Sequence, residues 1–145
     1  ATPLGDPDLG TGVERMVRIN CLRSIDGMAD IQAVIASPSP PPALMLPKVV
    51  SPDEVRGLDD LLSEPGLGTR LRVIIETNAG LNACYEIAQS SRRIDAMFFG
   101  GVDMAAELRA GNSWEALLYA RSRVVHAAAG AGLAMVFTGM RHFRH

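Results

Sequence analysis

The stretch that decides the fold is residues 71–80, which read Leu-Arg-Val-Ile-Ile-Glu-Thr-Asn-Ala-Gly. Its first half is a short apolar run rich in β-branched residues, which is typical of a buried β-strand. The run ends in Glu76 and Thr77, so polar groups stand where the strand stops. The segment that follows, residues 80–90, carries a weak helical pattern. A strand followed by a helix predicts one βα unit.

The same alternation continues on both sides of this unit. Four further apolar runs of strand length occur, at residues 16–20, 44–48, 96–100 and 133–137. Helical patterns stand between them, at residues 24–35, from Pro52 onward after the N-cap Ser51, and at residues 114–129 between Ser113 and Gly130. Strands that alternate with helices imply right-handed βαβ units and a parallel sheet, so the predicted class is α/β. The apolar character of the runs predicts a sheet covered on both faces.

Composition excludes several classes of protein. The chain has 145 residues, with 14 Lys and Arg against 16 Asp and Glu, and the charge is too balanced for nucleic acid as the main partner. No apolar run approaches the ~20 residues of a membrane span, and no signal peptide opens the sequence. Two cysteines cannot form a disulfide framework, so we expect a cytoplasmic protein. A complete (β/α)₈ barrel takes ~250 residues, so this chain is too short to be one.

Polar side chains follow four successive strands of the predicted sheet. Arg18 ends the first run, Lys48 the second and Glu76 the third, and the fourth continues through Gly100 and Gly101 to Asp103. Ligands of parallel α/β folds bind at the carboxyl ends of the strands, so these residues predict a site at one rim. The alternative is that each is simply the polarity of a loop that begins where a strand stops.

The residue types at this rim suit one another chemically. Glu76 and Asp103 stand one βα unit apart, and two neighbouring carboxylates with open positions suit Mg²⁺. Without a metal the two would repel each other, and the pKa of one would be raised. Arg18 has the planar guanidinium that grips a substrate carboxylate, and Gly100-Gly101 would let a ligand approach the backbone. Lys48 could neutralise charge near the site, although we expect its role to be structural.

Five motifs in the right order carry a resemblance to a known family. They are Val-Arg-Ile-Asn at 17–20, Leu-Pro-Lys-Val at 46–49, Ile-Glu-Thr-Asn-Ala-Gly-Leu-Asn at 75–82, Phe-Gly-Gly-Val-Asp at 99–103 and Ala-Leu-Leu-Tyr-Ala-Arg-Ser-Arg-Val-Val at 116–125. The series resembles the citrate lyase beta-subunit-like family, within the group of CoA-ester lyases and aldolases that includes malyl-CoA and citramalyl-CoA lyases. The resemblance runs from about residue 14 to residue 133.

The resemblance implies a TIM barrel, of which this chain would carry about five central βα units. It implies Mg²⁺ held by Glu76 and Asp103, Arg18 as the catalytic residue on the carboxylate of the oxo-acid half, and Gly100 and Gly101 beside the substrate. The implied reaction is carbon–carbon cleavage, or condensation, of citryl, malyl or citramalyl thioesters of CoA or acyl carrier protein. It also implies a homo-oligomer, a trimer or hexamer. We expect residues 1–15 to be a loose lead-in and residues 16–145 a partial barrel lyase domain.

The sequence departs from the family in ways that leave an alternative open. Val50 stands where the family usually has Glu, and residues 134–139 lack the family's Asp-Gly motif. Strands that precede and follow the five are missing, so two parallel edges would need covering by further chain or by a partner. The alternatives are a truncated non-catalytic or interaction subunit that retains the metal-site residues, or part of a longer chain. The choice among thioesters, and between CoA and acyl carrier protein, is also open.

Overall fold

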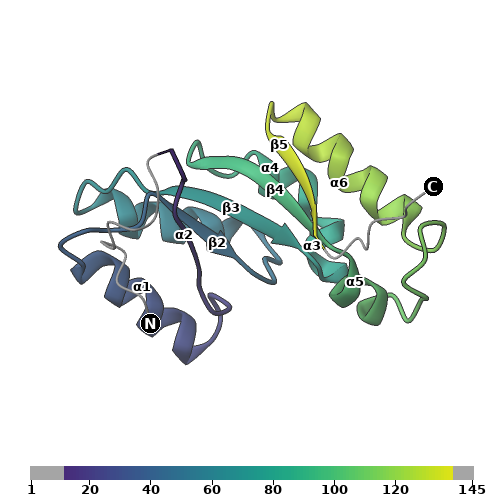
Figure 1. Ribbon diagram of the computed structural model, residues 1–145, viewed down its shortest axis with the longest axis horizontal. Helices are drawn as coiled ribbons and strands as arrows, with labels where there is room; N and C mark the ends of the chain where they lie inside the picture. Colours follow the sequence, from purple (N-terminus) through teal and green to yellow (C-terminus); the bar gives the residue numbers. More distant parts are fainter. Residues whose placement is uncertain (1–11, 139–145) are drawn as a thin grey trace.

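A computed structural model describes residues 12–138 as one parallel sheet with helices (Figure 1). The five strands lie side by side in chain order, which is the arrangement that successive right-handed βαβ units produce. The strands are β1 (Met16–Arg18), β2 (Ala43–Leu46), β3 (Arg70–Ile75), β4 (Ile94–Gly100) and β5 (Ala134–Thr138). The helices are α1 (Ile25–Ala36), α2 (Pro52–Ser63), α3 (Asn78–Asn82), α4 (Cys84–Ala88), α5 (Gly101–Glu107) and α6 (Leu118–Gly130).

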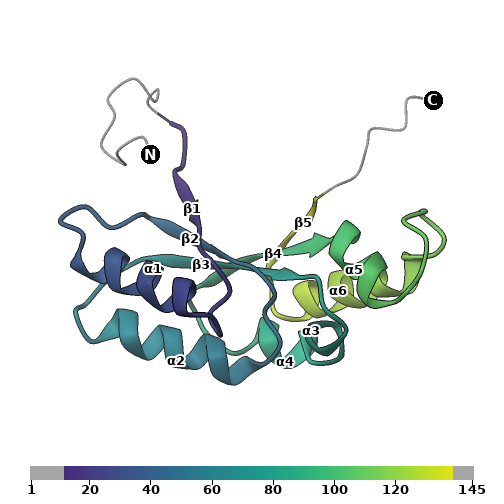
Figure 2. The same ribbon diagram turned by 90° about the horizontal axis from the view of Figure 1, so that it is seen from below.

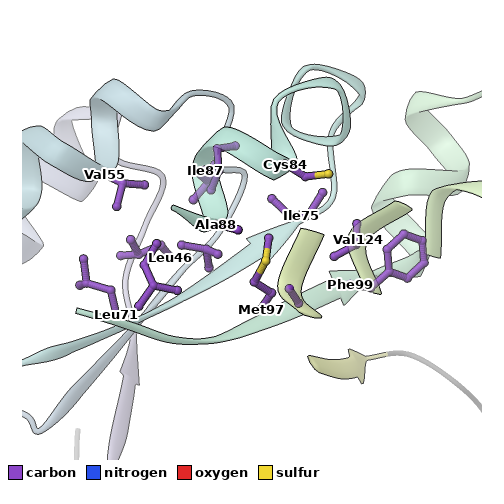
Figure 3. Close-up of a cluster of buried hydrophobic side chains, with 14 of the residues drawn as sticks. Leu46, Val55, Leu71, Ile75, Cys84, Ile87, Ala88, Met97, Phe99 and Val124 are labelled. Carbon is purple, nitrogen blue, oxygen red and sulfur yellow. The ribbon is translucent and has the colours of Figure 1, made fainter. Parts of the chain in front are cut away.

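The main core lies between the sheet and the helices. Figure 3 shows Leu46 and Ile75 of the strands gathered with Val55 of α2, Ile87 of α4 and Val124 of α6. All five side chains are fully buried. Alternate residues of a strand point to opposite faces, so each strand sends every second side chain into this core.

The opposite face of the sheet is not layered with helices in the part of the chain that is described. Figure 2 shows α1, α2, α4 and α6 on one side of the sheet. On the other side a small apolar cluster forms from Ile74, Ala96 and Phe98, with Met45 packed against it. Within the described residues helices therefore cover one face of the sheet, and the covering of both faces stays a prediction. Side chains of neighbouring strands pack together in this cluster, so the strands are apolar on this face too.

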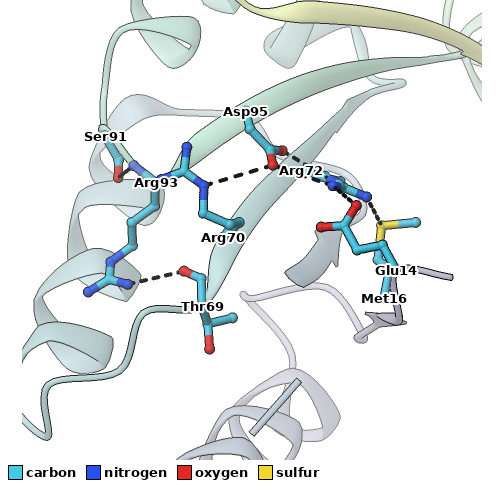
Figure 4. Close-up of polar contacts among 8 residues, drawn as sticks. All are labelled: Glu14, Met16, Thr69, Arg70, Arg72, Ser91, Arg93 and Asp95. Carbon is cyan, nitrogen blue, oxygen red and sulfur yellow. Dashed lines mark hydrogen bonds and ion pairs between the residues drawn. The ribbon is translucent and has the colours of Figure 1, made fainter. Parts of the chain in front are cut away.

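Charged residues occupy the amino-terminal part of β3 and β4 (Figure 4). Arg72 donates from Nε to Asp95 at 3.0 Å and pairs with Glu14 through its Nη2. Arg93 donates from Nη1 to the carbonyl oxygen of Thr69 at 3.0 Å. These pairs fix the amino-terminal part of the sheet, at the opposite end from the predicted rim.

The predicted strands are confirmed, whereas three details of the helices differ. The helix expected over residues 80–90 is two short helices, α3 and α4, which meet at Ala83. The helix expected from Trp114 begins at Leu118, although Ser113 does accept a hydrogen bond from the Ala116 N–H at 3.2 Å. Helix α5 is not predicted by the sequence, because the pattern around Gly101 indicates only the end of a strand.

Two further expectations concern the ends of the chain and membrane-spanning helices. The lead-in at 1–15 and the domain end at 145 fall largely or wholly outside residues 12–138. Among the helices that are described, none is long and apolar enough to span a membrane.

Candidate active site

Glu76 is a buried carboxyl group at the carboxyl end of β3. Its side chain is 3% exposed, and its Oε1 accepts a hydrogen bond of 3.0 Å from the backbone N–H of Lys48. Burial raises the pKa of Glu76, and a hydrogen bond with Asp103 raises it further. The chain thus holds a carboxyl group at a place where its charge needs a compensating partner.

Gly100 makes the room that Glu76 occupies. A β-carbon at position 100 would stand 2.6 Å from Glu76 Oε2 and 2.7 Å from its Cβ. Such distances are far inside van der Waals contact, so a side chain cannot be added without displacement. The space left by Gly100 is therefore filled by the Glu76 side chain. A β-carbon at Gly101 would meet its neighbours at 3.5 Å or more, which is ordinary contact.

Asp103 reaches Glu76 from the next βα unit. It lies in the first turn of α5, directly after β4, and is exposed to solvent. Its carboxyl group lies close enough to Glu76 to raise the pKa of that buried group. Two neighbouring carboxylates repel each other, and a bound cation would relieve that repulsion.

Arg18 brings a positive charge to the same rim. It is the last residue of β1 and its side chain is exposed. Burial is the largest influence on the pKa of Glu76, and the charge of Arg18 acts in the opposite direction by favouring the ionised form. The three principal residues predicted from the sequence, Arg18, Glu76 and Asp103, thus lie at or just after the carboxyl ends of β1, β3 and β4.

Lys48 contributes through its backbone. Its N–H binds Glu76, its side chain is exposed, and its φ of 52° lies in the left-handed region. The structural role expected for Lys48 agrees with this contact. Sequence reasoning did not find the contact, because no residue-type signal marks a backbone N–H as a ligand for a distant carboxylate.

Two other polar residues at the rim have structural partners. Asn20 donates from both its backbone N–H and its Nδ2 to Asp30 Oδ2, at 2.8 and 2.9 Å, which ties the end of β1 to α1. The Asn78 N–H at the start of α3 donates to Glu107 Oε2 at 2.9 Å. Asn20 belongs to the first of the five motifs, but the sequence pattern indicates neither partner carboxylate.

The donor set at the rim fits a magnesium ion. Glu76 and Asp103 would offer hard oxygen ligands from two elements, and Mg²⁺ binds through one or two carboxylates while keeping waters that a substrate can replace. Within residues 12–138 no group of three or more His, Cys, Asp and Glu side chains could hold a metal ion, so a closed zinc-type cage is not present there.

Comparison with known proteins decides the family. A family model described as HpcH/HpaI aldolase/citrate lyase matches residues 5–144. The chain belongs to the HpcH/HpaI aldolase/citrate lyase family. The resemblance inferred from the five motifs is therefore confirmed.

Relatives of known name support the family assignment. Over 92% of its length the chain is 34% identical to the mitochondrial citramalyl-CoA lyase of Mus musculus, and it covers 44% of that enzyme. It is 31% identical to the citrate lyase subunit beta of Escherichia coli K12, covering 83% of this chain and 42% of that subunit. The chain spans less than half the length of either relative.

Solved structures of the family share the fold. RipC from Yersinia pestis is 38% identical with a TM-score of 0.80, over 84% of this chain and 56% of that one. A protein CitE from Mycobacterium tuberculosis, solved in complex with magnesium and pyruvate, is 24% identical with a TM-score of 0.68 and is 49% covered. The five strands thus correspond to part of the citrate lyase beta TIM barrel, as predicted.

Proposed function

We propose that this chain carries the metal-binding part of a Mg²⁺-dependent carbon–carbon lyase that cleaves a 3-hydroxyacyl thioester. The observation that carries the proposal is the buried Glu76 carboxyl group, which lies near Asp103 and occupies the space that Gly100 leaves free. A buried carboxylate with a purely structural role is expected to pair with a fixed cation such as Arg, not with a second carboxylate.

Each of the three rim residues has a separate task in this proposal. Glu76 and Asp103 would hold the metal, and the Lys48 N–H keeps Glu76 Oε1 in a fixed direction. Bound at this pair, Mg²⁺ supplies Lewis acidity toward the hydroxyl and carboxylate oxygens of the substrate. Arg18 would bind the same carboxylate with its guanidinium group and so orient the bond to be cleaved.

The proposed reaction is a retro-Claisen-type cleavage. The substrate hydroxyl loses its proton and becomes the carbonyl of the oxo-acid. The electron pair of the broken carbon–carbon bond passes to the α-carbon of the thioester, and that carbon then takes up a proton. Citryl, malyl and citramalyl thioesters of CoA or acyl carrier protein share this β-hydroxy thioester arrangement, and they form the proposed substrate class.

The relatives support this reaction class. The similar enzymes of known name are a citramalyl-CoA lyase and a citrate lyase subunit, and a protein of the same fold was solved with magnesium and pyruvate. Pyruvate is an oxo-acid of the size that cleavage of a citramalyl thioester releases.

The test is metal binding and turnover in Glu76→Gln. We expect this variant to weaken Mn²⁺ binding, measured by electron paramagnetic resonance, by about tenfold or more and to abolish Mg²⁺-dependent cleavage across the three thioesters. Glu86→Gln changes an exposed carboxylate on α4 and serves as the matched control. Full activity in Glu76→Gln would refute the proposal. Glu76-dependent metal binding without turnover of any thioester would favour the non-catalytic subunit.

A further inference from the structure

The loop after β2 has a backbone conformation that its surroundings must hold. Lys48 adopts a φ of 52°, which residues with a β-carbon rarely adopt. This conformation turns the Lys48 N–H toward Glu76 Oε1 and leaves its carbonyl group facing another partner. A change in the Lys48 peptide would therefore move the donor that fixes Glu76.

An ion pair from two other segments grips this loop. Arg23, in the loop after β1, donates from Nη2 to the Lys48 carbonyl oxygen at 3.1 Å and from Nη1 to Glu54 Oε2 at 2.7 Å. The second oxygen of Glu54 accepts the Val50 N–H at 3.1 Å. The pair thus binds the carbonyl group of Lys48 and the N–H two residues later, which fixes the peptide units around Lys48.

The largely buried side chain of Glu54 distinguishes this pair from an ordinary surface ion pair. The Glu54 side chain is only 11% exposed, and that of Arg23 is 44% exposed. The Arg56–Asp53 pair is 2.9 Å long, has both side chains more than half exposed, and joins two residues of the same helix α2. An exposed pair of that kind contributes little, whereas Arg23 and Glu54 also satisfy two backbone groups.

We propose that Arg23 and Glu54 are positioning residues for the metal site. They hold the Lys48 peptide so that its N–H orients Glu76 Oε1, and they thereby link the loops after β1 and β2 to the carboxyl end of β3. The inference rests on the proposed function, because Glu76 needs a fixed orientation only as a ligand. In this proposal both residues act through the backbone groups of Lys48 and Val50.

The experiment compares Arg23→Met and Glu54→Gln with Arg56→Met in the full chain. We expect the first two to raise the Kd for Mn²⁺ roughly tenfold, the lower end for groups that orient metal ligands. We expect Arg56→Met to leave the Kd within about twofold, since it removes only an exposed pair. Hydrogen exchange of the Lys48 and Val50 amides, followed by NMR, should become faster in the first two variants alone.

The outcomes separate this inference from the proposed function. A Kd in Arg23→Met and Glu54→Gln equal to that of Arg56→Met overturns it, and so does a lower unfolding temperature in these variants with no change in Kd. If the unaltered protein fails to bind Mn²⁺ through Glu76, the proposed function fails. Hydrogen exchange of the Lys48 amide then tests the ion pair by itself. Faster exchange in Arg23→Met supports the claim that the pair holds the loop, and unchanged exchange overturns that claim.

Discussion

Replacing Gly100 by Ala is the sharpest single test of how the site is built. The φ and ψ of Gly100 are −91° and 86°, and this φ lies outside the left-handed region that favours glycine. Backbone strain therefore does not explain why glycine stands here. The added methyl group would instead collide with Glu76, whose Oε2 and Cβ lie 2.6 and 2.7 Å from its position, and with Ile74 at 3.3 Å.

The size of the effect follows from these distances. Carbon atoms in contact prefer about 3.5–4.0 Å, so the Glu76 Cβ must move by roughly 1 Å. Because a β-carbon is fixed to the backbone, rotation of the side chain cannot relieve this contact. Overpacking of this kind costs about 1–3 kcal/mol of folding free energy. A carboxylate displaced by that amount should lose about tenfold to hundredfold in metal affinity.

The assay pairs Gly100→Ala with Gly101→Ala. Both proteins are unfolded in urea to obtain the free energy of unfolding, and both are titrated with Mn²⁺. At position 101 the new β-carbon would meet Phe99, Asn112 and Leu117 at 3.5–3.6 Å, which requires no displacement. We expect Gly101→Ala to change stability by less than about 0.5 kcal/mol and to keep its metal affinity.

Equal behaviour of the two variants would refute the reasoning. If Gly100→Ala keeps both its stability and its Mn²⁺ affinity, Glu76 does not depend on the space beside Gly100. A loss of affinity in both variants would point to the glycine pair as a ligand-contacting segment, which was the role expected from the sequence.

Two further predictions concern stability away from the site. In α2, a β-carbon at Gly57 would meet nothing within 4 Å, so Gly57→Ala should raise the free energy of unfolding by about 0.5–1 kcal/mol in urea titrations. Burial alone would raise the pKa of Asp59, but hydrogen bonds from Ser91, Arg93 and Ser63 outweigh it and lower the pKa below 3.8. The stabilisation by Asp59 should therefore be present at neutral pH and be lost as pH falls through the lowered pKa. Asp59→Asn should be less stable than the unaltered protein at pH 7, and unfolding measured down to pH 3 should show the difference shrinking; a constant difference would contradict this.

The strands and the residues at their ends were predictable because their signals are local. An apolar run such as 71–75 marks a strand by its own composition, and the next polar residue then stands at the rim. Arg18 and Glu76 were found in this way. Helix α5 was missed because Gly101 and Val102 are poor helix formers, and the helix begins without a side-chain cap.

The contacts that shape the site were not predictable, because they join residues far apart in the chain. The space at Gly100 has meaning only once β3 and β4 are paired in register, with Ile75 beside Phe99. The hydrogen bond from Lys48 to Glu76 depends on a left-handed backbone at a lysine, which no sequence pattern marked. No sequence signal marks Arg23, and the pattern marks Glu54 only as the glutamate three residues after the N-cap Ser51.

The sequence by itself determined the order of strands and helices, the family and the residue types at the rim. It could do so because periodicity, caps and short motifs are properties of neighbouring residues. Only the tertiary structure decided that Glu76 is buried near Asp103. It also decided that Gly100 leaves room for the Glu76 side chain and that the Lys48 N–H donates a hydrogen bond to it. The physical reason is that burial and hydrogen-bond partners arise when parallel strands bring separate βα units together at one edge of the sheet.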